Sequence, residues 1–297
     1  MLFRSKTEMP LFEKDSARLS FKLSGRSYSA VNTEEVGESA VRTLEGSELA
    51  FIVANISDQK IAKQLLQLAD IVVNFAAETH VDRSILNPDQ FIKTDVYGTY
   101  VLLEAARESK SFIKFVHVST DEVYGAAHEK SFSESDPINP RNPYSASKAA
   151  ADRMVYAYNQ TYGLPINIVR PSNNFGPYQY PEKLIPVMIL KAFREEQLPV
   201  YGNGRQIRDW LFVRDTAKAI ELVVEKGAIG EVYNIAGGNE KENIFIVQKI
   251  LEKLEKPLSL IKYVKDRPGH DLRYSLNDNK IREQLGYSES EDRKSVV

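Results

Sequence analysis

Hydrophobic and polar positions follow a repeating order from about residue 50 onward. Short, nearly continuous apolar runs that end in polar loops occur at AFIVANI (50–56), DIVVNFAAE (70–78), IKFVHVSTD (113–121) and LPINIVRPSNNFG (164–176). Such runs are typical of parallel strands buried on both faces. The intervening segments have helical spacing, as in GTYVLLEAARES and in YSASKAAADRMVYAYNQTYG (144–163). This order predicts an α/β fold built on a doubly wound parallel sheet.

The second half of the chain is less regular and richer in loops. It combines helical segments such as PEKLIPVMILKAFREE and ENIFIVQKILEKLEK with short strands such as EVYNIAGG. We expect a first domain over residues 1–170 and a smaller lobe over residues 171–297, with some segments returning to the first domain. Ligands of doubly wound sheets bind at the carboxyl ends of the strands. The polar segments AAETHVDRS, STDE and PSNN each follow an apolar run directly, which places them at that edge.

The amino-acid composition excludes several kinds of catalytic and binding site. The chain has 297 residues, a net charge of −2, four histidines and no cysteine, so it has neither thiolate nucleophiles nor cysteine-based zinc sites. The histidines form no H-E-x-x-H pattern, and we expect no metal. The balanced charge argues against nucleic-acid binding, and no apolar run is long enough to predict a membrane span. A cytoplasmic location is the expectation.

Two pairs of residues could carry chemistry. Tyr144 and Lys148 form Y-x-x-x-K one helical turn apart, where a lysine ammonium would favour the tyrosine phenolate as a base. Taken alone, this motif is more often a surface tyrosine beside a solvated lysine. Asp121 and Glu122 follow Thr120 at the end of an apolar strand. An exposed turn is their alternative explanation, but two adjacent buried carboxyls can hold opposite protonation states.

The motifs STDEVYG, PYSASK, SNNFGPYQYPEKLIP, RDW and DRPGHD together resemble the dTDP-glucose 4,6-dehydratases, which are extended short-chain dehydrogenases/reductases. The resemblance runs from about residue 50 to residue 287. It implies a Rossmann-like NAD-binding first domain, a lobe that binds the nucleotide sugar, and NAD as cofactor. It also implies an NAD-dependent hydro-lyase whose substrate is dTDP-glucose and whose product is the 4-keto-6-deoxy sugar.

The resemblance also implies roles for the two pairs. Tyr144, with Lys148, would act as the base when sugar C4 is oxidised, and Thr120 would hydrogen-bond the C4 hydroxyl. Glu122 would then remove the C5 proton. Asp121, kept protonated, would donate to the departing C6 hydroxyl, and the hydride would return to C6.

Further binding residues are implied by the same match. Those expected at the cofactor, besides Tyr144 and Lys148, are Asn55, Ile56, Phe75, Ala76, Ala77, Glu78, Thr94 and Asn174. Those expected at the substrate, besides Thr120, are Thr79, Asn173, Lys183, Leu184, Pro199, Tyr201, Arg208, Asn243, Arg267 and His270. The arginines suit phosphate oxygens, because a guanidinium offers two parallel donors. A homodimer formed through two long helices, one of which carries Tyr144, is also implied.

Three departures from the family pattern stand out. Asn55 occupies a position where an acidic residue is expected near the adenine. Residues 1–49 lack the glycine-rich turn that binds a pyrophosphate, since Gly25, Gly37 and Gly46 have the wrong spacing. The C-terminal end of the family pattern is missing too. We interpret both ends, MLFRS and DRKSVV, as the result of a truncated or frame-shifted gene.

Three alternatives to this function remain. Another nucleotide-sugar dehydratase would use the same residues, and the sequence does not distinguish a thymine from a uracil base. A 4-epimerase needs the Tyr-Lys pair but not the Asp-Glu pair. A non-catalytic protein that binds nucleotide sugars is favoured by the absent glycine turn and opposed by the complete set of catalytic residues.

Overall fold

The computed structural model describes residues 2–3, 27–31, 40–43 and 49–290. Gly25, Gly37 and Gly46 lie outside these residues, as do the C-terminal segment DRKSVV and all of MLFRS except Leu2 and Phe3. Within the described part, no helix combines the length and the apolar character needed to cross a lipid bilayer.

An eight-stranded sheet forms the centre of the fold, with the strand order β11-β7-β6-β5-β1-β2-β4-β3. Its parallel half consists of β5 (Ile71–Asn74), β6 (Lys114–Val118), β7 (Ile166–Pro171) and β11 (Val232–Ile235). On the other side, β2 (Ser27–Val31) and β4 (Leu49–Val53) are parallel, whereas β1 (Leu2–Phe3) and β3 (Ala40–Thr43) pair antiparallel to their neighbours. The predicted doubly wound α/β sheet is confirmed.

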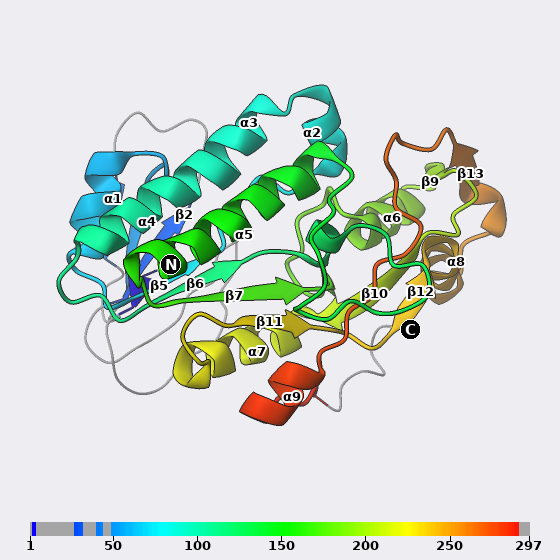
Figure 1. The fold of residues 1–297 in the computed structure, drawn as a ribbon. Coiled ribbons are helices and arrows are strands. Elements are labelled where there is room, and N and C mark those ends of the chain that lie inside the picture. The colour runs from blue at the N-terminus through cyan, green and yellow to red at the C-terminus, as the bar shows by residue number, and fades with distance from the viewer. Residues whose placement is uncertain (1, 4–26, 32–39, 44–48, 291–297) are drawn as a thin grey trace.

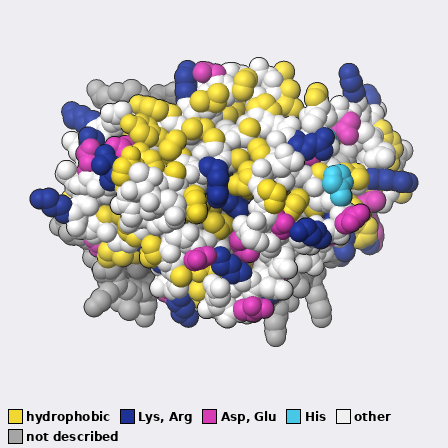
Figure 2. Space-filling view, viewed as in Figure 1, with side chains coloured by type: hydrophobic (Ala, Val, Ile, Leu, Met, Phe, Trp, Pro, Cys, Tyr) yellow, Lys and Arg dark blue, Asp and Glu magenta, His cyan; other side chains and the backbone are white. Residues whose placement is uncertain are grey.

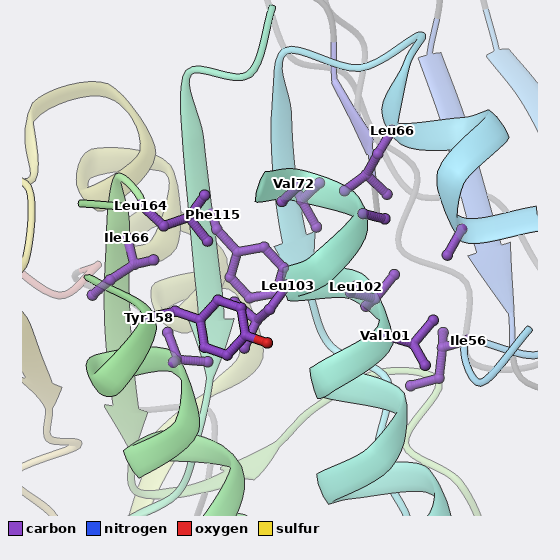
Figure 3. Packing of buried hydrophobic residues seen from close by; sticks show 14 of the residues in the cluster. Ile56, Leu66, Val72, Val101, Leu102, Leu103, Phe115, Tyr158, Leu164 and Ile166 are labelled. Atoms are coloured by element: carbon purple, nitrogen blue, oxygen red, sulfur yellow. The ribbon is translucent and has the colours of Figure 1, made fainter. Parts of the chain in front are cut away.

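Helices cover both faces of this sheet (Figure 1). One face carries α1 (Gln59–Leu66), α4 (Thr99–Glu108) and α5 (Pro143–Tyr162), and the other carries α7 (Val213–Lys226) and α9 (Asn279–Leu285). Successive strand residues point to opposite faces. Phe115 accordingly packs with Leu103 and Tyr158 beneath α4 and α5 (Figure 3), whereas Val116 packs against the α7 layer. Burial on both faces explains why the strands are apolar throughout.

The ends of α5 and the segment before α4 have distinct local structures near the site. Asn142 caps α5 by accepting from the Ser145 amide, and Gly163 ends the helix in the left-handed conformation at φ 66°. Ahead of α4, the short helices α2 (Val81–Leu86) and α3 (Asp89–Phe91) are followed by a π-helical segment, η1 (Ile92–Gly98). A π-helical segment inside a helix often marks a functional site.

The second half of the chain forms two small sheets with their own helices. One sheet contains β8 (Asn173–Phe175), β10 (Ile207–Phe212) and β12 (Glu240–Glu242), and the other pairs β9 (Leu198–Tyr201) with β13 (Ile261–Val264). The helical segments here are α6 (Leu184–Phe193), α8 (Asn243–Lys253) and η3 (Leu258–Leu260). Between these segments, α7 and β11 rejoin the large sheet. In Figure 1 the arrowheads of β6 and β7 point toward this half of the molecule.

Candidate active site

The two adjacent carboxyls lie at the carboxyl end of β6, on the short 3-10 helix η2 (Asp121–Tyr124). Thr120 caps this helix, and its hydroxyl oxygen lies 3.4 Å from the Glu122 amide nitrogen. Thr120, Asp121 and Glu122 are all buried. The exposed-turn explanation of the pair is therefore wrong, because the helix turns both side chains into the protein rather than toward solvent.

Asp121 has an environment that favours its neutral form. The side chain of this residue is 3% exposed. Its Oδ1 accepts from the Thr120 hydroxyl at 3.1 Å, while its Oδ2 is buried without a partner among the described residues. Burial, together with the nearby charge of Glu122, raises the pKa of Asp121 to about 8. Asp121 is thus mostly protonated at neutral pH.

Glu122 has a different set of neighbours. Its Oε2 lies 3.4 Å from Asn142 Nδ2, 3.2 Å from Ser145 Oγ and 3.3 Å from the Tyr274 hydroxyl. The Asn142 amide and the Ser145 hydroxyl can donate to this oxygen, whereas the single proton of Tyr274 is shared with Asp271 Oδ2 at 2.9 Å. The sequence interpretation missed all three of these neighbours. The helix-capping pattern at Asn142 and Ser145 could have indicated the first two, whereas no local pattern points to Tyr274.

Tyr144 and Lys148 lie one turn apart on α5, and both are buried. Burial raises the pKa of Tyr144 well above its usual value, as do the charges of Glu122 and Asp95, while a hydrogen bond with Thr120 lowers it. Lys148 Nζ donates to the backbone oxygen of Val118 at 2.7 Å. Burial lowers the pKa of Lys148. In this structure the ammonium is therefore held by the end of β6.

The helix η2 is fastened to the sheet at its far end by Tyr124. The Tyr124 hydroxyl receives a hydrogen bond from Arg170 Nη1 at 2.6 Å and donates to Asn234 Oδ1 at 2.9 Å. Arg170 in turn pairs with the buried carboxylate of Asp152 on α5 at 2.8 Å. A 3-10 helix of four residues has few hydrogen bonds of its own, so this network fixes where the carboxyls stand.

The residues predicted to contact the cofactor follow the ends of three strands. Asn55 and Ile56 follow β4, residues 75–78 (Phe75, Ala76, Ala77 and Glu78) follow β5, and Asn174 lies on β8. Asn55 Oδ1 accepts from the Ser57 amide at 2.9 Å. The Asn174 side chain donates a hydrogen bond to Ser172 O through its nitrogen and accepts one from the Thr216 hydroxyl through its oxygen. Thr94 is buried on η1. The prediction of cofactor contacts at these residues stays a prediction.

The residues predicted for the substrate form a second group, and Tyr274 lies between one of them, Arg208, and the catalytic Glu122. Arg208 lies with its guanidinium 4.3 Å from the centre of the Tyr274 ring and donates to Asp271 O at 3.0 Å. Arg267 lies 3.6 Å from Asp82, whose other oxygen accepts from Tyr201 at 3.0 Å.

Other members of this group occupy different surroundings. Lys183 Nζ donates to the backbone oxygen of Thr79. His270 lies 2.6 Å from Asp266, and burial together with the charge of Arg267 lowers the pKa of His270 to about 4, so its ring is neutral at pH 7. Leu184 packs against an apolar cluster that includes Trp210, and Pro199 belongs to the paired strand β9.

Unpartnered polar atoms indicate where a ligand would fit. Most buried polar atoms in proteins have a hydrogen-bond partner, because leaving one unpaired costs about 1–3 kcal/mol. Among the described residues, several of the exceptions fall on predicted site residues, namely Asp121 Oδ2, Asn173 Oδ1, Asn243 Oδ1 and Arg267 Nε. This distribution fits a ligand with many polar groups, such as a sugar nucleotide.

Comparison with known proteins agrees with this chemistry. Residues 16–297 match the family model described as GDP-mannose 4,6 dehydratase. A dTDP-glucose 4,6-dehydratase from Xanthomonas campestris pv. campestris (strain B100) is 48% identical over 266 residues, which cover 82% of this chain and 76% of that protein. The chain belongs to the NAD-dependent epimerase/dehydratase family. The resemblance to the dTDP-glucose 4,6-dehydratases is thereby confirmed.

Solved structures of the NAD-dependent epimerase/dehydratase family separate two of the alternatives. The dTDP-glucose 4,6-dehydratase DesIV from Streptomyces venezuelae, with NAD and TYD bound, matches with a TM-score of 0.81 at 42% identity and covers 84% of this chain and 79% of its own. A UDP-glucuronic acid 4-epimerase from Bacillus cereus, with UDP-glucuronic acid and NAD, has a TM-score of 0.80 but only 27% identity, over 84% and 80% of the two chains. The fold is common to both activities, whereas the sequence is nearer to the dehydratase.

Proposed function

We propose that this protein is a dTDP-glucose 4,6-dehydratase that works with NAD. The observation that carries the proposal is the unequal treatment of two adjacent carboxyls. Asp121 is buried, has an unpartnered oxygen and a pKa raised to about 8, whereas Glu122 accepts from the side chains of Asn142 and Ser145 and lies close to the Tyr274 hydroxyl. Elimination of water needs one acid and one base on neighbouring sugar carbons, and this pair supplies both.

The residues of the chain divide the reaction among them. Tyr144 accepts the proton of the C4 hydroxyl, and Thr120 hydrogen-bonds the C4 oxygen. The new C4 ketone makes the C5 proton acidic, and Glu122 removes it. Asp121 gives its proton to the C6 hydroxyl, which leaves as water.

Bound NAD would supply the hydride acceptor for C4 and the hydride donor for C6, and Glu122 would return its proton to C5. The residues that would hold it are those at the ends of β4 and β5, with Thr94, Lys148 and Asn174. Asn173, Lys183, Arg208, Asn243, Arg267 and His270 would hold the nucleoside diphosphate. Support comes from the unpartnered atoms on Asn173, Asn243 and Arg267 and from the buried guanidinium group of Arg208.

The test is a titration of the protein with NAD, followed by incubation with dTDP-glucose and an assay for the 4-keto-6-deoxy product. We expect binding and turnover. Turnover of UDP-glucose at an equal rate would show that the base is not discriminated. Inversion at C4 without loss of water would favour a 4-epimerase. Binding of dTDP-glucose without turnover would favour a non-catalytic binding protein.

We also propose that the protein forms a homodimer through α4 and α5. Figure 2 shows hydrophobic side chains gathered over these helices. Ile92, Tyr97 and Tyr156 are large and exposed on η1 and α5, and Ala146 and Ala150 leave room for a close approach of a second helix pair. Sedimentation should give twice the mass of one chain, and Tyr97→Glu should give a monomer.

A cytoplasmic location stays a prediction.

A further inference from the structure

Asp95 is a buried carboxyl that the proposed reaction does not use. It lies on the π-helical segment η1 and is 1% exposed. Its Oδ1 accepts from the Glu78 amide at 2.8 Å, and its Oδ2 lies 2.7 Å from Ser147 Oγ. Asp95 thus joins the loop after β5, where cofactor contacts are predicted, to the helix that carries the Tyr144–Lys148 pair.

The contact with Ser147 couples the protonation state of Asp95 to the hydrogen bonds of α5. Ser147 Oγ also lies 2.8 Å from the backbone oxygen of Tyr144, and a serine hydroxyl has a single proton to donate. If that proton goes to the Tyr144 carbonyl, the short contact with Asp95 is a hydrogen bond only when Asp95 is protonated. If it goes to Asp95, the carbonyl of Tyr144 keeps only the backbone hydrogen bond that it accepts within α5. The charge of Asp95 therefore selects between two hydrogen-bond arrangements in the first turn of α5.

The charged neighbours of Asp95 are members of the candidate active site. Burial raises the pKa of Asp95 to about 6, while Lys148, the hydroxyl of Ser147 and the Glu78 amide oppose this rise and the Glu78 carboxylate adds to it. In return, the charge of Asp95 raises the pKa of Tyr144 and the pKa of Lys148. The charged groups that act on Asp95 are thus Lys148 on α5 and Glu78 in the loop after β5, and Lys148 has the larger effect on its pKa.

We propose that Asp95 is a positioning residue that fixes Ser147 and the Glu78 loop around the Tyr144–Lys148 pair and that sets the charge state of this pair through its own. The proposal rests on the proposed function for the role of Tyr144. Asp95→Asn is the informative variant. An asparagine can accept from the Glu78 amide and donate to Ser147, so it keeps every contact of a protonated Asp95 and removes only the charge.

The first experiment needs no substrate or cofactor. A carboxyl with a raised pKa binds its proton more tightly in the folded state, so its contribution to stability is present at low pH and is lost as pH rises through about 6. The melting temperature of Asp95→Asn, relative to the native protein, should therefore rise between pH 5 and pH 8. Asp89→Asn is the matched control, because Asp89 is an exposed carboxyl just before η1 whose side chain is 60% exposed. An equal difference at both pH values for Asp95→Asn would overturn the proposal.

The second experiment measures C4 oxidation in a single turnover as a function of pH. Without the charge of Asp95, both the limb that reports Tyr144 and the limb that reports Lys148 should move to lower pH, by about one unit for a nearby charge. A uniform loss of rate with no movement of either limb would mean a purely structural role and would refute the charge coupling. If the native protein shows no turnover, the proposed function fails, while the melting experiment still tests Asp95.

Discussion

The two halves of the candidate site are built in different ways. The catalytic half comes from one stretch, residues 119–148, in which a strand end, a 3-10 helix and the start of α5 follow one another. The nucleotide half comes from segments around residues 79, 183, 201, 208, 243 and 267, which lie far apart in the chain. The first half is dominated by buried titratable groups, and the second by cationic side chains, of which Arg267 lies beside the carboxylate of Asp82 and Arg208 donates to backbone oxygens.

This difference indicates what each half controls. Groups buried at a strand end, with shifted pKa values, suit proton transfer. Charged groups that already have partners, such as Arg267 beside Asp82, suit the recognition of an anion that replaces those partners. Substitutions in the catalytic half should therefore lower kcat, and substitutions in the nucleotide half should raise KM.

The largest effect is expected for Tyr144→Phe. Removing the base should slow C4 oxidation by about 10²- to 10⁴-fold, so that no transient NADH absorbance develops after mixing with dTDP-glucose. Tyr162→Phe is the control, because Tyr162 ends the same helix and is exposed. Normal NADH formation by Tyr144→Phe would remove Tyr144 from the mechanism.

Glu122→Gln should separate the two chemical steps. It should still oxidise C4, so NADH accumulates, but elimination should slow by about 10²-fold or more because no base removes the C5 proton. Exchange of the C5 proton with deuterated water is the measurement. Asp121→Asn should keep this exchange and lose only the departure of the C6 hydroxyl. Equal behaviour of the two variants would contradict the division of roles between the carboxyls.

In the nucleotide half, Arg267→Ala should raise KM for dTDP-glucose by about 10- to 100-fold with little change in kcat. A hydrogen bond to a charged group contributes about 1.5–3 kcal/mol, and 1.4 kcal/mol corresponds to a factor of ten. Arg205→Ala is a control, since Arg205 is an exposed arginine close to β10. A fall in kcat with unchanged KM would show that the two halves are not separate in function.

The smallest effect concerns pH. Asp121 must be protonated to act as the acid, and its pKa is raised to about 8. Elimination should therefore be independent of pH near neutrality and should fall about tenfold per unit well above pH 8, as for any single acid group. The measurement is the rate of water loss with C4 oxidation complete. In Asp121→Asn this decline should be absent.

The sequence predicted the catalytic half better than its surroundings. Thr120, Asp121 and Glu122 could be placed at a strand end because FVHV is a buried parallel strand, and Tyr144 and Lys148 could be placed on one helix face by their spacing. The contacts of Tyr274 and Asp95 could not be predicted, because Tyr274 reaches Glu122 from 152 positions away and Asp95 lies on a π-helical segment. In the nucleotide half the residues came from family resemblance, and the pairing of Arg267 with Asp82 depends on tertiary packing that no local pattern records.

Because Tyr124 is anchored, the loop that follows it can change its length during evolution without moving the active site. The chain leaves the site at Tyr124, which is held by Arg170 and Asn234, and re-enters it at Asn142, which caps α5. Between these fixed points, residues 128–130 are exposed, and exposed loop tips accept insertions readily. A lineage could lengthen or shorten the loop at this tip, for instance to cover a larger sugar, without displacing the two carboxyls that perform the elimination.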